Sequence, residues 1–541
     1  MAKESFDYII IGGGSAGCLL ANRLSADPKN TVCLVEAGAT DRTFWVRNCN
    51  PINMLYLMGS KKYNWLYHTR PEARTGNRPF FWPRGRGLGG SSSINAMIYT
   101  RGHPWDYDHW AALGNAGWDF QSVLPAFKKA ERQCRGADAY HGDAGTMDVS
   151  DTNFHFPVSD AFLQACQQAG FSLNDDMNGA TQEGCGYFQV TQTESGGRCN
   201  SGAAFLDDVM HRDNLTVMTN THVSRVLFAG KTAVGIECFA GSDRTRVLTL
   251  KAAKEVVLSA GVIGSPHLLK LSGVGPAEEL NKFGIPLVHD LPGVGENLQD
   301  HPDILLRCLD KSGTCLGAVP NKQFFKFIGA MFSRKKPFRF TPTDCGGFIK
   351  SDPSLDIPDL QLQFAAMRMK PHGKDMSMSL RSGYVLHICH LRPKSRGRVV
   401  LESADPLVAP GIEANYFAED EELEALVKGV RIGRDILRQA ALEPFHKLEE
   451  APGEAVQSDE QIRQFLHNKV ETVYHTAGSC KMGNDSLAVV DANLCVHGTE
   501  KLRVMDSSIM PTITGSNIHG PTVMIAERGA EMIFASPKIP I

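Results

Sequence analysis

The stretch FDYIIIGGGSAGCLLANRL, residues 6–24, decides the fold of the first part of the chain. The run from Asp7 to Ile11 predicts a short buried strand, and the glycines that follow predict a turn. The apolar residues after the turn fall on one side of a helix, at Ala16, Leu19, Leu20 and Leu24. A strand, a glycine turn and a helix in this order are typical of the start of an α/β nucleotide-binding domain.

Within the turn, Gly12, Gly14 and Gly17 have the spacing G-x-G-x-x-G, and a second apolar run, TVCLVEAG, contains Glu36. Gly12 permits the tight turn, Gly14 lets the backbone approach a pyrophosphate, and Gly17 lets the helix pack closely on the strand. Glu36 can accept hydrogen bonds from an adenosine ribose and disfavours a 2′-phosphate. The alternative is a glycine turn without a ligand. The pattern predicts a dinucleotide site and leaves FAD and NAD open.

Length and charge limit the class of protein. A chain of 541 residues exceeds the size at which single cores stop growing, so we expect at least two domains. The net charge of -3 gives no reason to expect a nucleic-acid partner. The 14 cysteines are scattered without a C-x-x-C pair, which argues against a metal site and favours reduced thiols.

The sequence shows no targeting or membrane-spanning segment. Three glycines from Gly12 interrupt the first apolar run, so it does not resemble a signal peptide. No stretch reaches the roughly 18 apolar residues that a transmembrane helix requires. We therefore expect a soluble, cytoplasmic protein.

Two further segments resemble parts of a nucleotide-binding domain. FWPRGRGLGGSSSINAMIYTRG, residues 81–102, has backbone N–H groups and hydroxyls that could cradle an anion or a polar ring edge, although a plain surface loop is the alternative. EVVLSAGVIGSPHLLKLSGVGP, residues 255–276, predicts another strand and a helix, with Ser265 as N-cap and Pro266 at the first helical position.

The middle of the chain, from about 311 to 465, changes character. Alternating stretches such as GRVVLES and proline-rich joints predict a separate sheet-containing domain. Residues 321–343 interleave basic residues and phenylalanines without an acid, which suits peripheral contact with an anionic membrane. A substrate-gating lid or a surface helix is the competing interpretation of this segment.

Several long motifs occur in a fixed order along the whole chain. They are GGGSAG with Glu36, GRGLGGSSSINAM, GVIGSPHLLKLSGVGP, GVGENLQDHP, YHTAGSCKMG and VMDSSIMPTITGSNIHGPTVMIAE. In this combination the chain resembles the glucose-methanol-choline (GMC) oxidoreductase family, in particular its bacterial FAD-dependent alcohol dehydrogenases and choline dehydrogenase.

The resemblance implies an α/β fold with two domains and selects FAD over NAD. A discontinuous, Rossmann-like FAD-binding domain would comprise residues 1–155, 200–310 and 466–541. A second, α+β substrate domain, built on an antiparallel sheet, would comprise residues 156–199 and 311–465.

The family pattern also implies which residues bind the cofactor. The pyrophosphate would lie by Gly12, Gly14, Ser15 and Gly17, the ribose by Glu36, and the isoalloxazine by Gly89, Gly90, Ser91 and Asn95. Val223 would meet adenine through its backbone, and Asp506 would lie by the ribityl-pyrophosphate. Some members attach the flavin through a histidine in the GGSSS loop, where this chain has Ile94 and Asn95, so we expect non-covalent FAD.

Two histidines are the candidate catalytic residues. Oxidation of an alcohol by a flavin needs one base to remove the hydroxyl proton while a hydride passes to flavin N5, and histidine has a suitable pKa. His475, in YHTAGSCKMG, is at the family's catalytic position. His519 matches the second member of the catalytic pair, which is asparagine in the branch that this chain resembles most. We expect His475 to be the base and His519 to hydrogen-bond the substrate oxygen.

The identity of the substrate stays open. Asp344, in PTDCGGFIK, is at the position where the choline-oxidising branch has a glutamate that faces the substrate cation, so choline is one hypothesis. The leading function is FAD-dependent oxidation of a primary alcohol to an aldehyde, with electrons passed to a quinone or other carrier. The alternatives are an oxygen-using alcohol oxidase, choline dehydrogenase, and a non-redox flavin-binding lyase or scaffold.

Overall fold

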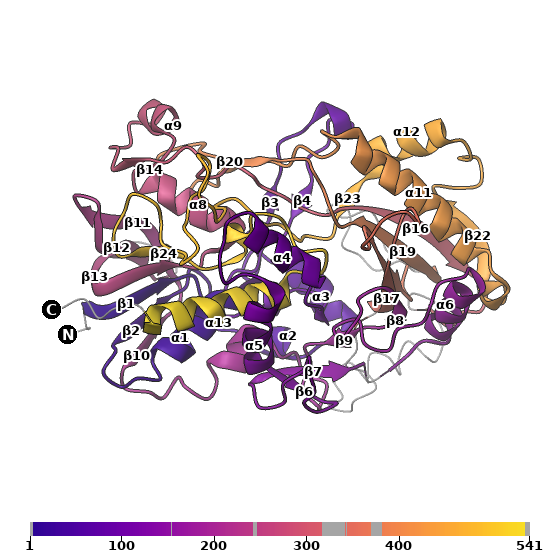
Figure 1. The fold of residues 1–541 in the computed structure, drawn as a ribbon, viewed down its shortest axis with the longest axis horizontal. Helices are drawn as coiled ribbons and strands as arrows, with labels where there is room; N and C mark the ends of the chain where they lie inside the picture. Colours follow the sequence, from indigo (N-terminus) through magenta and orange to yellow (C-terminus); the bar gives the residue numbers. More distant parts are fainter. Residues whose placement is uncertain are drawn as a thin grey trace.

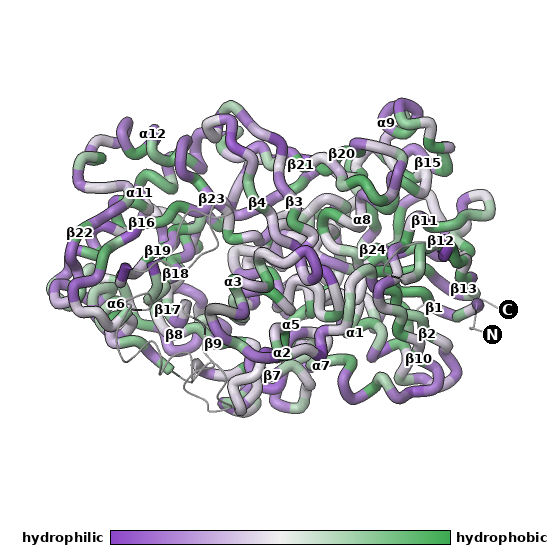
Figure 2. The backbone as a smooth tube through the Cα atoms, turned by 180° about the vertical axis from the view of Figure 1, so that it is seen from behind, coloured by the Kyte–Doolittle hydropathy of each residue, from purple (hydrophilic) through white to green (hydrophobic). Residues whose placement is uncertain are grey.

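The computed structural model describes residues 4–152, 154–241, 246–315, 341, 343–368 and 381–535. Two halves lie side by side, each built around its own sheet, and both termini lie at the outer edge of the first half (Figure 1). Each half has its own large hydrophobic core. Along the backbone, hydrophobic residues concentrate in the strands of the two sheets (Figure 2).

The first sheet is centred on β1 (Ser5–Ile11), which pairs in parallel with β2 (Val32–Val35) and β13 (Arg246–Leu258). The side chains of Ile9 and Ile10 are fully buried, as the apolar run predicts. The remaining strands of this sheet are β10 (Leu215–Met218), β11 (Thr221–Ala229), β12 (Thr232–Ala240) and β24 (Leu502–Val504). The parallel Rossmann-like sheet is therefore confirmed, with β11 and β12 as an antiparallel extension.

Helix α1 (Ser15–Leu24) packs against β1 and β2 of this sheet, and α13 (His519–Ala535) packs on α1 (Figure 1). The buried carboxylate of Glu527 in α13 accepts hydrogen bonds from the Arg23 guanidinium at the end of α1. The first and last helices of the domain are thus joined by a charged contact that water does not screen strongly.

The helix α8 (Gly261–Leu271) begins four residues before the predicted N-cap at Ser265. Pro266 therefore lies inside the helix, where its missing N–H leaves the Val262 carbonyl without its helical partner. That carbonyl accepts a hydrogen bond from Ser479 Oγ instead, at 2.5 Å. The predicted N-cap at Ser265 was wrong. The helix can begin earlier because Ser479, from a distant segment, hydrogen-bonds the Val262 carbonyl that Pro266 leaves without a partner.

The second sheet is antiparallel, with strand order β22-β16-β19-β18-β17-β8 and β23 paired to β16. Helices cover one of its faces (Figure 1). The helices are α6 (Pro157–Gln168), α11 (Asp420–Leu437) and α12 (Asp459–Lys469). The strands are β8 (Gly184–Tyr187), β16 (Pro302–Asp310), β17 (Thr343–Ile349), β18 (Leu360–Ala365), β19 (Gly383–His390), β22 (His446–Ala451) and β23 (Glu471–Thr472).

The strands of the second sheet alternate between two buried faces. In β18, Leu360, Leu362 and Phe364 belong to the core beneath the helices, whereas Gln361 and Gln363 belong to the opposite face. All six residues of this strand are buried, so the polar face is also covered. A buried polar face is costly unless its groups are hydrogen-bonded, which makes it a place to look for a site.

The predicted domain boundaries differ from those that the two sheets define. All nine residues of β16 lie in the segment 200–310, predicted for the cofactor domain, yet they form the centre of the antiparallel sheet. β23 likewise lies within 466–541 and pairs with β16. β16 follows turn-rich sequence of the cofactor half, and β23 has only two residues just after α12, so composition alone does not mark the crossing between domains.

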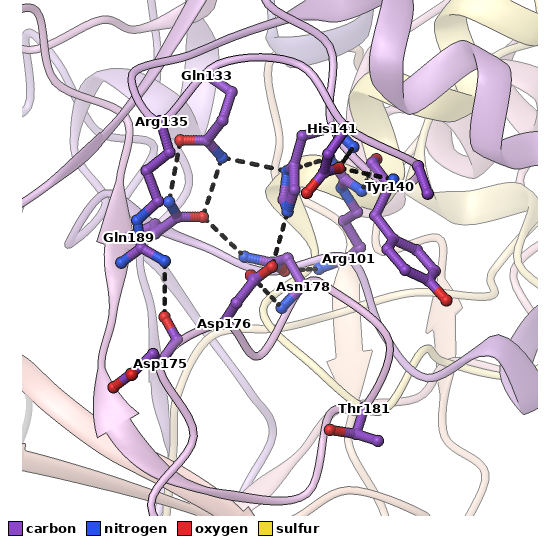
Figure 3. Close-up of polar contacts among 12 residues, drawn as sticks. Arg101, Gln133, Arg135, Tyr140, His141, Asp175, Asp176, Asn178, Thr181 and Gln189 are labelled. Carbon is purple, nitrogen blue, oxygen red and sulfur yellow. Dashed lines mark hydrogen bonds and ion pairs between the residues drawn. The ribbon is translucent and has the colours of Figure 1, made fainter.

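A small sheet of order β5-β9-β7-β6 holds a buried polar network. It comprises β5 (Ile98–Tyr99), β6 (Glu131–Gln133), β7 (Met147–Asp151) and β9 (Gln189–Val190). At its centre, His141 lies 3.2 Å from Glu131 through Nδ1 and 2.9 Å from Asp176 through Nε2 (Figure 3). Burial disfavours the charged imidazole, but the hydrogen bonds to Asp176 and Glu131 outweigh it and raise the pKa of His141 to about 9.

We expect this network to make stability depend on alkaline pH. Because the pKa of His141 rises from 6.5 unfolded to about 9 folded, its stabilisation is complete below pH 6.5 and is lost as the pH rises through about 9. His141→Gln should lower the free energy of unfolding by roughly 3 kcal/mol at about pH 7, the low end for breaking a buried ion pair.

Chemical denaturation between neutral pH and about pH 10 would measure this difference. Lys428→Gln breaks an exposed pair with Asp352 and is the matched control, for which we expect no measurable change. Equal alkaline losses of stability in the parent and in His141→Gln would contradict the assignment.

Candidate functional site

A cavity of about 750 Å³ is lined by residues from both halves of the protein. The first half contributes the turn after β1, strand β11 and helix α8. The second half contributes the polar face of the antiparallel sheet through Thr343, Gln363 and His387. The segments around His475 and His519 complete the wall. One cavity therefore joins the predicted cofactor site to the predicted catalytic residues.

The glycine turn forms one end of this cavity. Gly12, Gly14 and Ser15 line it, whereas Gly17 lies behind the turn. A Cβ on Gly17 would lie only 1.9 Å from the Gly12 carbonyl oxygen, so this glycine permits the close packing of helix on strand. Within the described chain, α1 has no side-chain cap, and the free N–H groups of its first turn suit an anion.

Glu36 holds the turn together from the end of β2. Its carboxylate accepts hydrogen bonds from the backbone N–H groups of Gly13, Gly38 and Gly87, at 2.8, 2.7 and 2.9 Å. It is buried and also lines the cavity. One side chain thus fixes three separate loops and still faces the space where a ribose would lie.

The glycine-serine loop contacts the first turn directly. Gly90 begins a 3-10 helix, η2 (Gly90–Ser93), with a φ of 51°, and a Cβ there would lie 2.7 Å from the Gly14 Cα. Gly90, Ser91 and Asn95 line the cavity. Gly89 does not, because it packs against Asn200 instead.

The other two predicted cofactor residues also line the cavity. Val223 lies in β11, beside an irregularity in its pairing with β12. Asp506 accepts hydrogen bonds from the Gly261 N–H and from Ser265 Oγ, at 2.9 and 2.6 Å. This carboxylate therefore anchors the start of α8 at the cavity wall.

His475 is buried and both of its ring nitrogens have a partner. Nδ1 lies 3.1 Å from Nδ1 of His301, and Nε2 lies 3.0 Å from the Asn517 amide nitrogen. Burial, helped by the nearby Arg84 guanidinium, lowers the pKa of His475 to about 3. The imidazole is therefore neutral at physiological pH, as a base must be.

His519 is the first residue of α13 and lines the same cavity. Among the described residues, neither of its ring nitrogens has a hydrogen-bond partner, although the side chain is buried. Burial and the charge of Arg198 lower the pKa of His519 to about 4. A buried neutral imidazole without a partner is costly and suits a ligand that supplies one.

Asp344 lies apart from the other predicted site residues and is not among the residues that line the cavity. Its neighbour Thr343 faces the cavity, but the pairing of β17 with β18 is irregular between Thr343 and Cys345, so Asp344 is the extra residue of a bulge and points toward α6. The Asp344 carboxylate instead accepts a hydrogen bond from Ser159 Oγ in α6, at 2.8 Å. The prediction that Asp344 faces a substrate cation is therefore not supported.

Sequence reasoning missed several residues of the cavity wall. Arg84 is partly buried and donates to the Tyr474 carbonyl, and Asn517 contacts His475. Gln363 and His387 come from the polar face of the second sheet. The signal for Asn517 was its place two residues before His519, whereas polar residues in apolar strands give no pattern that marks a site.

The predicted membrane-contacting segment, residues 321–343, lies almost entirely outside the described residues, so its two interpretations remain predictions. Among the residues that the structure does describe, no helix is both long and apolar enough to cross a bilayer.

Family models for GMC oxidoreductases match residues 6–303 and 393–526. The chain belongs to the GMC oxidoreductase family. It is therefore an FAD-dependent oxidoreductase. The uncapped start of α1 and the glycines that bring Gly90 against Gly14 fit a bound FAD.

Similar proteins match over nearly the whole chain. An "alcohol dehydrogenase [acceptor]" of Pseudomonas putida is 44% identical over 98% of this chain and 95% of its own length. An "oxygen-dependent choline dehydrogenase" of Pseudomonas syringae pv. tomato is 41% identical over 99% of this chain and 95% of its own length. The crystal structure of pyridoxine 4-oxidase from Mesorbium loti has a TM-score of 0.88 at 29% identity, covering 98% of this chain and all of that chain.

We expect Gly90→Ala to weaken FAD binding about tenfold or more, because a Cβ at a positive φ strains the backbone and pushes against Gly14. Titration of the apoprotein with FAD, followed by flavin fluorescence, would measure the dissociation constant. Gly136→Ala is the matched control, since Gly136 also has a positive φ of 92° but nothing lies within 4 Å of its Cβ position. Equal affinity in both variants would contradict the proposed contact.

Proposed function

We propose that this GMC oxidoreductase oxidises a primary alcohol to an aldehyde and passes the electrons to a quinone or another carrier. The observation that carries the proposal is the neutral His475 imidazole in the wall of the cavity that also contains the glycine turn. The similarity to the Pseudomonas putida protein, which is named an alcohol dehydrogenase with an unspecified acceptor, supports an alcohol as the substrate.

FAD would be held by the turn at Gly12 and Gly14 with Ser15, by Glu36, by the loop of Gly90, Ser91 and Asn95, and by Val223 and Asp506. All of these residues line the cavity, which supports the assignment. When bound, FAD supplies the acceptor for the hydride that leaves the carbinol carbon. We propose that the flavin is non-covalent, since Ile94 and Asn95 replace the attached histidine of other members; acid precipitation should then leave the flavin in the supernatant.

His475 would act as the base. The alcohol R-CH₂-OH loses its hydroxyl proton to the imidazole and a hydride from carbon, which leaves the aldehyde. Because burial keeps the ring neutral, the base is in its competent form throughout the physiological range. The same low pKa makes the ring a weak base, so it would take the proton only as the hydride leaves the carbon and the hydroxyl becomes more acidic.

His519 would hold the substrate oxygen. Its two unpartnered ring nitrogens line the same cavity, and a hydroxyl oxygen can both donate to and accept from such a ring. An unpaired buried polar group costs about 1–3 kcal/mol, so a substrate that supplies the partner gains affinity and orientation.

We expect His475→Ala to slow flavin reduction by alcohol about a hundredfold or more, the usual contribution of a general base. His519→Asn should slow it by about tenfold at most, because asparagine keeps a donor and an acceptor. Anaerobic stopped-flow measurement of flavin bleaching would test both, with the exposed His211→Ala as control. A near-normal rate of flavin reduction in His475→Ala would contradict the role of His475 as the base.

The rate of flavin reduction should also be independent of pH between about pH 6 and 9. The reason is that His475 and His519, with pKa values of about 3 and 4, are both neutral over that range. A base becomes inactive when it is protonated, so any loss should occur only on the acid side. A midpoint near neutral pH would show that another group is the base.

The acceptor separates a dehydrogenase from an oxidase. We expect the protein, reduced anaerobically by a primary alcohol, to be reoxidised at least tenfold faster by a quinone analogue than by air-saturated buffer. A screen of aliphatic, aromatic, polyol and cationic alcohols, choline included, would supply the reductant. Faster reoxidation by oxygen would favour an alcohol oxidase, and failure of every alcohol to bleach the flavin would favour a non-redox lyase or scaffold.

A further inference from the structure

Asn517 connects the antiparallel sheet to His475. Its amide nitrogen lies 3.0 Å from Nε2 of His475, and its amide oxygen accepts a hydrogen bond from Gln361 Nε2 at 2.9 Å. The backbone N–H of Asn517 donates to Thr100 Oγ1 at 3.0 Å, which fixes the residue in place. Gln361, on β18, is fully buried.

The hydrogen bonds run in one direction, from Gln363 through Gln361 and Asn517 to the imidazole. Gln363 Nε2 donates to the Gln361 amide oxygen at 3.1 Å. A side-chain amide has its acceptor on one side and its donors on the other, so Gln361 presents its NH₂ group to Asn517. Asn517 in turn presents its oxygen to Gln361 and its NH₂ group to His475. Three amides thus transmit one orientation to the imidazole.

An amide N–H directed at a ring nitrogen requires a lone pair on that nitrogen. Nε2 of the neutral His475 is therefore unprotonated, and the ring proton lies on Nδ1, 3.1 Å from Nδ1 of His301. Asn517 lines the cavity and His301 does not. The unprotonated nitrogen is consequently the one on the cavity side. An imidazole nitrogen has one lone pair, so an alcohol hydroxyl would have to displace the Asn517 N–H from Nε2 to be deprotonated there. The other tautomer would place a proton on Nε2 and leave no base on the cavity side.

We propose that Gln361 and Asn517 are positioning residues that fix His475 in the tautomer with its proton on Nδ1 and its lone pair on Nε2. The inference rests on the proposed role of His475 as base. It adds that the substrate-side sheet, rather than the loop that carries His475, determines which ring nitrogen can accept the proton.

The charged groups around His475 do not determine its tautomer. Arg84 opposes protonation of the ring and Asp303 favours it, and both act on the charged form. The two neutral tautomers carry the same net charge, so these residues discriminate between them far less than a direct hydrogen bond does. His301 can accept from Nδ1 through its own unprotonated Nδ1, which is consistent with the same tautomer.

Histidine-selective ¹⁵N labelling of the holoenzyme would read the tautomer directly by solid-state NMR. The His475 resonances are those that disappear in His475→Gln. We expect a protonated Nδ1 and an unprotonated Nε2 in the parent and in the control Asn484→Asp, whose asparagine lies in an exposed turn. In Gln361→Leu, the Asn517 amide oxygen keeps only the longer hydrogen bond from Thr100 Oγ1, at 3.3 Å, so the amide can rotate more readily and a population protonated on Nε2 should appear. His475 protonated on Nε2 in the parent, or no change in Gln361→Leu, would overturn the proposal.

Kinetics would test the consequence of the tautomer. Gln361→Leu should reduce the rate of flavin reduction about tenfold, the change that one hydrogen bond controls, with the dissociation constant of the alcohol within about twofold of the parent. Asn517→Asp replaces the donor by an acceptor that stabilises the imidazolium, so its rate should fall as the pH drops through neutral, unlike that of the parent.

The two readouts separate this inference from the proposed function. If no alcohol reduces the flavin but the tautomer changes as described, the proposed function fails and the amide chain stands. If alcohols are oxidised but Gln361→Leu does not change the tautomer of His475, the positioning role of the amides is wrong and the proposed function is retained. Because Gln361→Leu keeps a similar volume, it carries the test even where Asn517→Asp does not fold.

Discussion

The rest of the structure depends on the convergence of three backbone N–H groups on the carboxylate of Glu36. They come from the first glycine turn, from the end of β2 and from the glycine-serine loop, three segments that share no helix or strand. Charge-assisted hydrogen bonds of this kind are about twice as strong as neutral ones. They bring Gly90 against Gly14 and so close one wall of the cavity. The same carboxylate faces the cavity, so the residue that shapes the cofactor site also lines it.

The second constraint is the buried polar face of the antiparallel sheet. A sheet buried on both sides usually has apolar residues on both faces. Here β18 and β19 keep Leu362 and Ile388 on the helix side and place Gln363 and His387 at the cavity. These polar groups are tolerated because they bond one another or the catalytic segments. The sheet is therefore part of the site as well as its support.

Much of the cofactor half could be predicted from sequence. The local backbone geometry requires the glycines of its motifs, and a carboxylate is required at Glu36. The parallel sheet, the FAD-dependent family and the general class of reaction followed from such motifs. The substrate half could not be predicted to the same depth. Asp344 and Thr343 are neighbours on β17, and an irregularity in the pairing of this strand, which the sequence does not reveal, places Thr343 at the cavity and turns Asp344 toward α6. β16 and the amide chain through Gln361 depend on pairings between distant segments, which leave no mark in local sequence.

The proline inside α8 has a consequence for how this helix is held to a distant segment of the chain. Pro266 leaves the Val262 carbonyl open, and Ser479, four residues after His475, occupies it. The carbonyl that lacks its partner within α8 thus holds Ser479 in place through a hydrogen bond. Any residue with a backbone N–H at position 266 would compete for that carbonyl and weaken its hydrogen bond with Ser479. A residue type that usually ends a helix here links α8 to the segment that carries His475.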